Sequence, residues 1–350
     1  MKSNYEPLGK HIQLVDYRNS EEVTSTVLGI SIDKEFMPSV ANVIGTDLSR
    51  YKLISKGLFA CNPMHVGRDE RLPIALYEKD SPAIVSPAYF MFEIIDRDVL
   101  NEEYLMMWLR RPEFDRECWF MTDGSVRGGI SWDDLCCIQL PVPPYERQLD
   151  VVESYRAITR RIAMKKEIND NLEAVLAASH SKMFFSKDTS EHSKLGELMT
   201  FGNGKSRPKT DGPIPVYGGN GVLSYTDHHN IENAVLIGRV GAYCGSVYLE
   251  QGICWVSDNA IFAKSKITKD EFFDYFLLKR LNLFNHHVGT GQQLLTQEIL
   301  NNIEVPKPVT EQIELFNRKA TSIFETIFTN SREIIRLQEL SDLLLSRLAG

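Results

Sequence analysis

The sequence predicts an α+β protein that contains two copies of one plan, each a head of short strands followed by a long helix. Three observations support this prediction: an internal repeat, an apolar heptad pattern after each copy, and short apolar runs separated by Gly, Pro and Asn in the heads. The chain has 350 residues, which is enough for two hydrophobic cores, because single cores stop growing at about 250–300 residues.

The internal repeat aligns residues 130–149 with residues 295–314 without a gap. Leu135, for example, matches Leu300 at an offset of 165 residues (300 − 135 = 165). Around Tyr104 the offset becomes 171 (275 − 104 = 171), so the second copy has a deletion between the two blocks. The repeat therefore predicts an internal duplication, with divergent heads on matching helices.

Two long helices are expected after the repeated blocks, because apolar residues there recur in alternating steps of four and three, the spacing of a coiled-coil seam. Polar residues interrupt both stripes, as in helix pairs that fix their register at some cost in stability. A stripe that packs only on its own head is the alternative. The apolar seam residues are Ile158, Ile162, Leu172, Leu176, Ile323, Ile327, Leu337 and Leu344, and the polar ones are Lys165, Asn169, Ser179, Asn330 and Ser341.

Composition limits the class of protein. The hydrophobic fraction of 43% and the charged fraction of 25% are those of a folded soluble protein, and no stretch approaches the roughly 20 apolar residues of a membrane span. We therefore expect a cytoplasmic protein. The net charge of −8 argues against a general nucleic-acid binder, so any DNA binding must be local or shared with partners. The six cysteines lack CxxC spacing and are expected to be buried thiols.

Polar loops of the heads carry the residues that we expect to contact nucleic acid. Arg and Lys pair with guanine edges or phosphates, and Gln or Asn pairs with adenine. Two basic loops contain glycines that allow close backbone approach, at residues 62–73 and 202–213. A solvated surface loop explains any single residue equally well, so the prediction concerns the loops before the residues. The candidates are Arg68, Arg71, Arg127, Lys205, Arg207, Lys209, Tyr217, Asn220, Arg239, Gln292 and Gln293.

The sequence contains no convincing catalytic or cofactor motif. Residues 202–206 (GNGKS) are similar to a phosphate-binding loop, but Met199 stands where that pattern requires glycine. Residues 143–145 (PPY) are similar to the catalytic motif of amino-methyltransferases, but Val142 replaces the required Asn or Asp. There is no strand-linked GxGxxG and no HExxH. We expect no catalytic residue and no metal site, although a hydrolase triad assembled in space stays open.

An ordered set of segments resembles the specificity (S) subunits of type I restriction-modification systems over nearly the whole chain. These segments are residues 62–77 (NPMHVGRDERLPIALY), 85–94 (VSPAYFMFEI), 138–148 (IQLPVPPYERQ), 214–222 (IPVYGGNGV), 235–247 (VLIGRVGAYCGSV) and 256–262 (VSDNAIF). Together with the duplication, this combination is far more specific than any one segment.

The resemblance implies target-recognition domains at residues 1–140 and 190–305, and conserved spacer helices at 141–189 and 306–350 that form an antiparallel coiled coil. Each domain would read one half of a bipartite, asymmetric DNA site. The helices would bind two modification (methyltransferase) subunits and hold the half-sites apart, since about 40 helical residues span roughly 60 Å and one DNA turn is ~34 Å.

The resemblance also implies a non-catalytic subunit that binds no cofactor directly. Partner subunits would use S-adenosylmethionine for adenine methylation, and ATP with Mg²⁺ where restriction subunits also join. The partners would be double-stranded DNA and these subunits, with no membrane. The alternative is a coiled-coil scaffold that binds proteins without sequence-specific DNA binding, for which the Gly- and Arg-bearing heads would have less use.

Overall fold

The computed structural model describes residues 5–39, 45–122, 128–186, 191–289 and 291–349. The chain divides into two compact units. The first unit is Met1–Met164 with Ile334–Gly350, and the second is Lys165–Glu333. Two long helices, α5 (Tyr145–Phe184) and α9 (Thr310–Ser346), each contribute one end to each unit. In the described ranges no helix combines the length and the apolar character needed to cross a membrane.

The first unit contains two four-stranded sheets and a two-stranded ribbon. Its strands are β1 (Tyr5–Pro7), β2 (Ile12–Leu14), β3 (Val27–Ile30), β4 (Phe36–Pro38), β5 (Lys52–Ile54), β6 (Phe59–Cys61), β7 (Ile74–Leu76), β8 (Ala83–Val85), β9 (Phe90–Ile94) and β10 (Gln139–Pro141). Its short helices are α1 (Val66–Asp69), α2 (Glu102–Leu109), α3 (Pro112–Met121) and α4 (Trp132–Cys137). The sheet orders are β2-β9-β6-β7 and β4-β3-β8-β5, and the ribbon is β1-β10.

Two separate cores form in the first unit because successive strand residues point to opposite faces. Phe59 and Phe92 stack with ring centroids 5.0 Å apart in the larger core, which α2, α3, α4 and the ends of α5 and α9 complete. Ala60, the neighbour of Phe59, points instead into a smaller core beneath the second sheet. The strands therefore carry apolar side chains on both faces.

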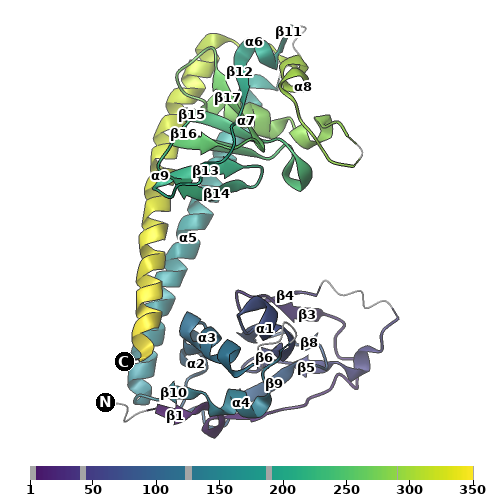
Figure 1. The fold of residues 1–350 in the computed structure, drawn as a ribbon, viewed down its shortest axis with the longest axis vertical. Helices are drawn as coiled ribbons and strands as arrows, with labels where there is room; N and C mark the ends of the chain where they lie inside the picture. The colour runs from purple at the N-terminus through teal and green to yellow at the C-terminus, as the bar shows by residue number, and fades with distance from the viewer. Residues whose placement is uncertain (1–4, 40–44, 123–127, 187–190, 290, 350) are drawn as a thin grey trace. The chain divides into compact units, whose positions relative to one another are not determined.

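The second unit contains a six-stranded sheet and its own ribbon. Its strands are β11 (His192–Lys194), β12 (Met199–Asn203), β13 (Ile214–Gly218), β14 (Gly221–Thr226), β15 (Ile231–Gly238), β16 (Val247–Val256), β17 (Ala260–Ser265) and β18 (Glu304–Pro306). Its short helices are α6 (Leu195–Leu198), α7 (Phe272–Arg280) and α8 (Gln297–Asn302). The sheet order is β12-β17-β15-β16-β13-β14, the ribbon is β11-β18, and α7 lies against the sheet (Figure 1).

The second unit repeats the two-core plan of the first. Val235 and Ile237 of β15 face the larger core, together with α7 and both long helices, while Ala234 and Leu236 face a small core with Cys254. This alternation matches that of Phe59 and Ala60 in the first unit.

The two units share strand pairing as well as core plan. In the first unit β2 pairs with β9 so that Ile12 faces Ile94, and in the second β12 pairs with β17 so that Met199 faces Ser265. Likewise β3 runs parallel to β8, and β13 runs parallel to β16. The ten-residue β16 pairs antiparallel with β15 and parallel with β13, as β7 pairs with β6 and β8 with β3, so one sheet in the second unit corresponds to two in the first.

The ribbons extend the duplication to the start of each unit. The backbone N–H of Leu8 donates to the carbonyl of Ile138 at 2.8 Å, and Leu195 donates to Ile303 at 2.9 Å. The acceptors differ by the 165-residue offset of the sequence repeat (303 − 138 = 165). The predicted α+β fold with an internal duplication is thus confirmed, and it reaches further upstream than the sequence alone indicates.

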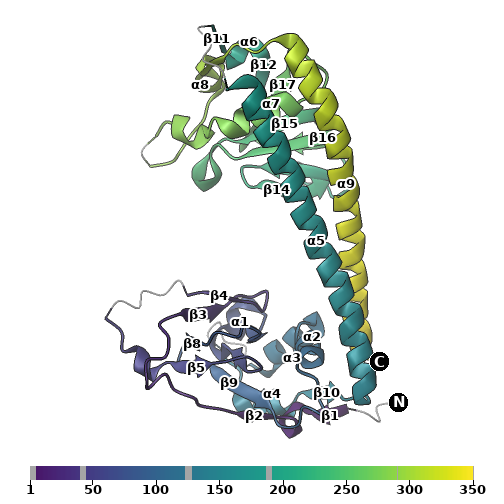
Figure 2. The same ribbon diagram turned by 180° about the vertical axis from the view of Figure 1, so that it is seen from behind.

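The predicted helix pair is also confirmed, because α5 and α9 run side by side in the second unit in both views (Figure 2). Lys165 forms an ion pair with Glu333 at 2.8 Å, while Asn169, one turn later, donates to the carbonyl of Ile327 at 3.4 Å. The partner number falls as the α5 number rises, so the helices are antiparallel. Both begin just after proline-containing strands and carry a glutamate in the first turn.

The seam residues predicted from the heptad pattern pack within the chain. Ile162 and Leu176 are buried, Ile323 and Ile327 pack against the larger core of the second unit, and Leu344 packs against that of the first. The others are half-buried, namely Ile158, Leu172 and Leu337. These side chains hold the fold together, so the exposed side chains of the same helices are the ones free to meet other molecules.

Candidate nucleic-acid interface

Three loops of the second unit that are far apart in sequence are joined by hydrogen bonds, and a fourth, basic loop is anchored to the same sheet. We call them the basic loop (residues 202–213), the hairpin turn (218–221), the arginine loop (238–246) and the glutamine loop (291–294). The Arg239 N–H donates to the carbonyl of Asn259 at 3.0 Å, and the Gly241 N–H donates to that of Gln293 at 3.1 Å. The Ser246 hydroxyl donates to the carbonyl of Gly219 at 2.6 Å. Candidate residues of separate segments are thereby brought together.

The basic loop is fixed at both ends and exposed in the middle. The Lys205 N–H donates to the carbonyl of Val256 at 2.9 Å, and the indole N–H of Trp255 donates to the carbonyl of Lys205 at 3.3 Å. At the other end the Thr210 hydroxyl lies 2.9 Å from that of Thr226. Arg207 and Lys209 lie between these anchors and line a hollow of about 290 Å³. Their cationic side chains are exposed and can meet acceptor groups such as phosphates or guanine edges.

The cations of the basic loop have no acidic partners within the described residues. Lys205, Arg207 and Lys209 form no ion pair there, and Asp211 is the one acid of the loop. An unpaired cation that binds phosphate releases condensed counterions from DNA without first breaking an internal ion pair. The loop therefore presents a local positive charge on a chain whose net charge is −8.

Arg239 and the two glutamines lie beside one another through backbone contacts. The Arg239 carbonyl accepts from the Leu295 N–H at 2.9 Å, and its Nε atom is buried without a hydrogen-bond partner among the described residues. Gln292 is exposed and Gln293 is half-buried. These groups can read a base edge with a guanidinium fork and two amides.

Tyr217 and Asn220 occupy different environments in the hairpin. Asn220 is exposed at the turn, where Gly221 takes a positive φ of 81° that suits glycine. Tyr217 is half-buried, and its hydroxyl donates to Glu250 at 3.0 Å. Burial beside Glu250 raises the pKa of Tyr217. Tyr217 thus supports the hairpin from below, while Asn220 faces solvent.

The arginine candidates of the first unit are paired with acids. Arg68 binds Asp69 through Nε at 2.7 Å and Nη2 at 2.9 Å, and this carboxylate raises the pKa of Arg68. Arg71 lies 3.3 Å from Asp33. Both arginines are exposed, so DNA phosphates would compete with exposed pairs that are weak in water. Arg127 lies outside the described residues.

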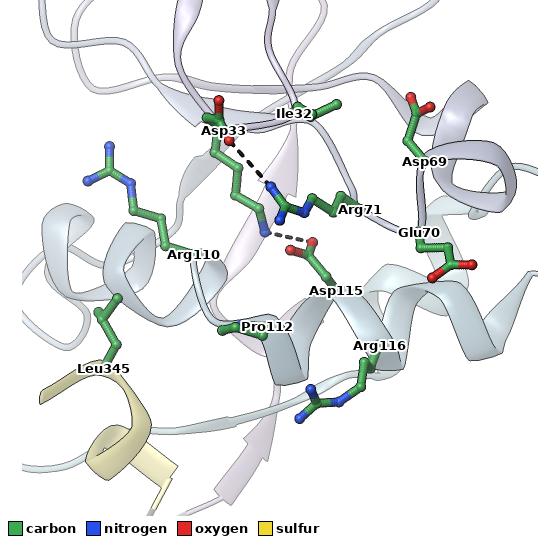
Figure 3. A pocket seen from close by; sticks show the side chains of 11 residues that line it. Ile32, Asp33, Asp69, Glu70, Arg71, Arg110, Pro112, Asp115, Arg116 and Leu345 are labelled. Atoms are coloured by element: carbon green, nitrogen blue, oxygen red, sulfur yellow. Dashed lines mark hydrogen bonds and ion pairs between the residues drawn. The ribbon is translucent and has the colours of Figure 1, made fainter. Parts of the chain in front are cut away.

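A buried ion pair that the sequence does not indicate lies beneath Arg71. Lys34 donates to Asp115 of α3 at 2.7 Å and also to the carbonyl of Leu109, and Asp115 accepts from the Leu72 N–H at 3.0 Å. Burial lowers the pKa of Lys34, and Asp115 opposes that shift. The pair joins the β3–β4 hairpin to α3 at the base of a hollow of about 440 Å³ (Figure 3). Only the fold brings Lys34 to Asp115, because 81 residues separate them.

The described residues contain no group of three or more His, Cys, Asp or Glu placed to hold a metal ion. The cysteines among them are free thiols, but the prediction of burial is wrong for Cys137, which is exposed at the end of α4, and for Cys136, which is half-buried. Burial raises the pKa of Cys61, Cys118 and Cys254, which makes them poor nucleophiles. The groups that the interface presents are hydrogen-bond donors and amides, which suit recognition of nucleic acid.

Comparison with known proteins agrees with this description. Residues 187–343 match the family model described as the type I restriction modification DNA specificity domain. A curated protein of Methanocaldococcus jannaschii, named as the specificity subunit of the type I restriction enzyme MjaX, is 20% identical over 95% of this chain and 84% of its own length. The crystal structure of the type I restriction-modification S subunit from M. genitalium superposes with a TM-score of 0.60 at 15% identity, covering 98% of this chain and 95% of that one.

Duplicated α+β heads on paired helices are the fold that this chain shares with that S subunit. Residues 187–343 thus contain the type I restriction modification DNA specificity domain, and the chain as a whole is similar to a type I specificity subunit, as the family resemblance in its sequence predicts.

Proposed function

We propose that this subunit reads a bipartite, asymmetric DNA site, one half with each head, and directs adenine methylation or cleavage by partner subunits in the cytoplasm. The recognition domains would be residues 1–140 and 190–305, and the spacer helices 141–189 and 306–350. The observation that carries the proposal is the duplication itself: two heads with one topology carry different loops. Two heads that share a topology but differ in their loops suit two different half-sites.

The loops divide into groups with different tasks. Exposed cations of the basic loop suit phosphate contacts, which set affinity and register. Arg239, Gln293 and Asn220 suit base edges, because a bidentate arginine or amide distinguishes guanine from adenine. In the first head, Arg68 and Arg71 would exchange their acidic partners for DNA.

The exposed faces of the long helices suit two copies of one partner. Val175 and Leu340 are both exposed and are repeat counterparts (340 − 175 = 165), and Ala178 and Leu343 are a second such pair (343 − 178 = 165). Exposed apolar side chains at matching positions are typical of protein interfaces. Two modification subunits, each with bound S-adenosylmethionine, would dock there, and restriction subunits using ATP and Mg²⁺ would join a cleaving complex.

The experiment that tests this proposal is co-expression with a type I modification subunit, followed by mapping of methylated adenines in host DNA. The expected result is one motif with two half-sites and a fixed gap. Replacing residues 190–305 by the same domain of a specificity subunit with another target should change one half-site and leave the other intact. Absence of methylation from a complex that does assemble would contradict the proposal and favour the scaffold alternative.

The length of the helix pair gives a second test. Removal of two turns from each of α5 and α9 at matching positions should change the gap between half-sites and preserve the half-sites themselves, because the helices connect the heads without reading bases. A change of half-site sequence with an unchanged gap would contradict a spacing role.

A further inference from the structure

Each unit exposes an aromatic side chain at the end of the helical segment that follows α2 or α7. In the first unit these are Trp119, 43% exposed, and Phe120, 84% exposed, at the end of α3. In the second unit it is Phe284, 41% exposed, in the single 3-10 turn Leu283–His286. Phe120 is the most exposed large hydrophobic side chain in the part of the chain that the structure describes.

Trp119 and Phe284 occupy equivalent positions of the repeat (284 − 119 = 165). The Trp119 carbonyl accepts from the N–H of Thr122 at 3.1 Å, and the Phe284 carbonyl accepts from His287 at 3.3 Å. Downstream of each aromatic, a second pair of equivalent backbone hydrogen bonds joins the chain to a loop of the same head. Ile130 donates to the carbonyl of Pro63 at 3.2 Å, as Leu295 donates to that of Arg239 at 2.9 Å. The duplication has therefore kept an exposed aromatic beside a candidate DNA loop in both heads, while the sequences around it have diverged.

Packing within the unit does not account for Phe120. The inner face of α3 already provides Phe114 and Cys118 to the core. An exposed Phe side chain lacks the ~1.5–3 kcal/mol of stabilisation that burial would contribute. A surface position without a binding role would therefore be expected to carry a polar residue. Phe120 instead follows Arg116 by one turn on the exposed face of α3.

The surroundings connect both aromatic sites with the proposed DNA interface. Arg116, which pairs with Glu113 at 3.1 Å, lines a hollow whose other charged residues are Lys34, Arg71, Arg110, Asp33, Asp69, Glu70 and Asp115 (Figure 3). Arg110 forms no ion pair with any described residue. In the second unit, Gly245 of the arginine loop approaches the backbone of Phe284 so closely that a Cβ there would collide with it. The helix and the turn that carry these aromatics thus lie next to Arg71 in the first head and the arginine loop in the second, both proposed above to contact DNA.

We propose that Phe120 with Trp119, and Phe284 in the second head, insert between or stack on base pairs at the border of each half-site. This inference rests on the proposed function. Apolar wedges of this kind partly unstack a base step and bend the duplex. A modification subunit must extrude its target adenine from the helix, and a nearby unstacked step lowers the cost of that extrusion.

The experiment uses the complex of the full chain with its modification subunit and a duplex of the mapped motif, with 2-aminopurine at the steps bordering each half-site. Unstacking of 2-aminopurine raises its fluorescence. Phe120→Ala and Phe284→Ala are compared with Tyr17→Ala, since Tyr17 is an aromatic side chain of the first unit that is 51% exposed. Phe120→Leu is the conservative variant, because leucine also acts as a wedge.

Wild type, Phe120→Leu and Tyr17→Ala should all give the fluorescence rise at both borders. Phe120→Ala should abolish the rise at the first half-site only and weaken binding about tenfold or more, and Phe284→Ala should do so at the second. Unchanged fluorescence and affinity in both alanine variants would overturn the inference while leaving the proposed function intact. So would normal fluorescence combined with weaker binding of the modification subunit, which would identify a protein contact. A wild-type complex without site-selective binding would overturn the proposed function itself.

Discussion

Lys165 of α5 and Asn330 of α9 occupy the same position of the internal repeat (330 − 165 = 165) and are joined by a hydrogen bond of 2.8 Å from Nζ to Oδ1. Asn330 in turn donates to Asn169 at 2.9 Å, and Lys165 also pairs with Glu333. When two copies of one helix pack antiparallel, equivalent residues of the two copies face each other at one level along the pair. Lys165 and Asn330 are such equivalent residues, so the polar layer lies at that level. A shift of one helix by one turn would separate all these partners, so the layer fixes the register.

The polar layer gives a testable coupling. Asn330→Leu should lower the free energy of unfolding by about 1–3 kcal/mol, because it leaves the Lys165 ammonium half-buried with one acceptor fewer. The double variant Lys165→Met, Asn330→Leu should recover most of that loss. Urea unfolding of all four proteins measures the interaction energy, and additive effects would show that the two side chains are not coupled.

Lys34 and Asp115 should behave as a buried ion pair. Asp115→Ala leaves the Lys34 ammonium and the Leu72 N–H without their acceptor, so we expect a loss of about 3–5 kcal/mol in the stability of the first unit. Arg71→Gln removes the exposed pair with Asp33 at the rim of the same hollow and should change stability by less than ~0.5 kcal/mol. Equal effects of the two substitutions in thermal unfolding would contradict the distinction between them.

Asp274 gives the second unit a dependence on pH. Burial raises the pKa of this carboxyl from its ordinary value of 3.8 to about 7, although an opposing interaction with the Ser265 hydroxyl favours the ionised form. Because the folded pKa is the higher one, the stabilising contribution of the neutral form is complete below about pH 4 and is lost as pH rises through 7. Asp274→Asn should therefore be more stable than wild type at pH 8, by about 2–4 kcal/mol.

The stability difference between Asp274→Asn and wild type should shrink as pH is lowered toward 4. Nearby Glu271 is also buried and is paired with Lys264 at 2.7 Å, so it remains in both proteins as a common background. Asp270→Asn, at an exposed acid of the same segment, is the control and should change stability by less than ~0.5 kcal/mol. A pH-independent gain from Asp274→Asn would show that burial of an ionised carboxylate is not its cause.

The basic loop and the arginine loop should differ in their dependence on salt. Arg207→Ala and Lys209→Ala should each weaken DNA binding for all sequences and reduce the slope of log K against log[salt] by about 1. Arg239→Ala should cost about 1–3 kcal/mol on the specific site and relax the base preference there. Affinity titrations at several salt concentrations separate the two behaviours, and a sequence-dependent loss from Lys209→Ala would contradict the phosphate assignment.

The sequence predicts the duplication, the paired helices and the basic loops, because these depend on periodicity and composition. The seam positions Ile162 and Leu176 are buried as the heptads indicate. Contacts between residues far apart in the chain cannot be predicted from these patterns, because Lys34 meets Asp115, and Ser246 meets Gly219, only after folding. The aromatic ends of α3 and its counterpart also escape it, because exposure of Phe120 is a property of the folded surface. The environment of Tyr217 is also hidden in the sequence, since the neighbouring glycines do not reveal that its hydroxyl donates to Glu250.

The most direct test of the central claim, that each head reads one half-site, is a methylation map of the complex carrying Arg239→Ala and Gln293→Ala in the second head. We expect the half-site of the second head to accept additional bases, while the other half-site and the gap stay unchanged. Relaxation of both half-sites, or of neither in a complex that still methylates DNA, would contradict independent reading by two heads.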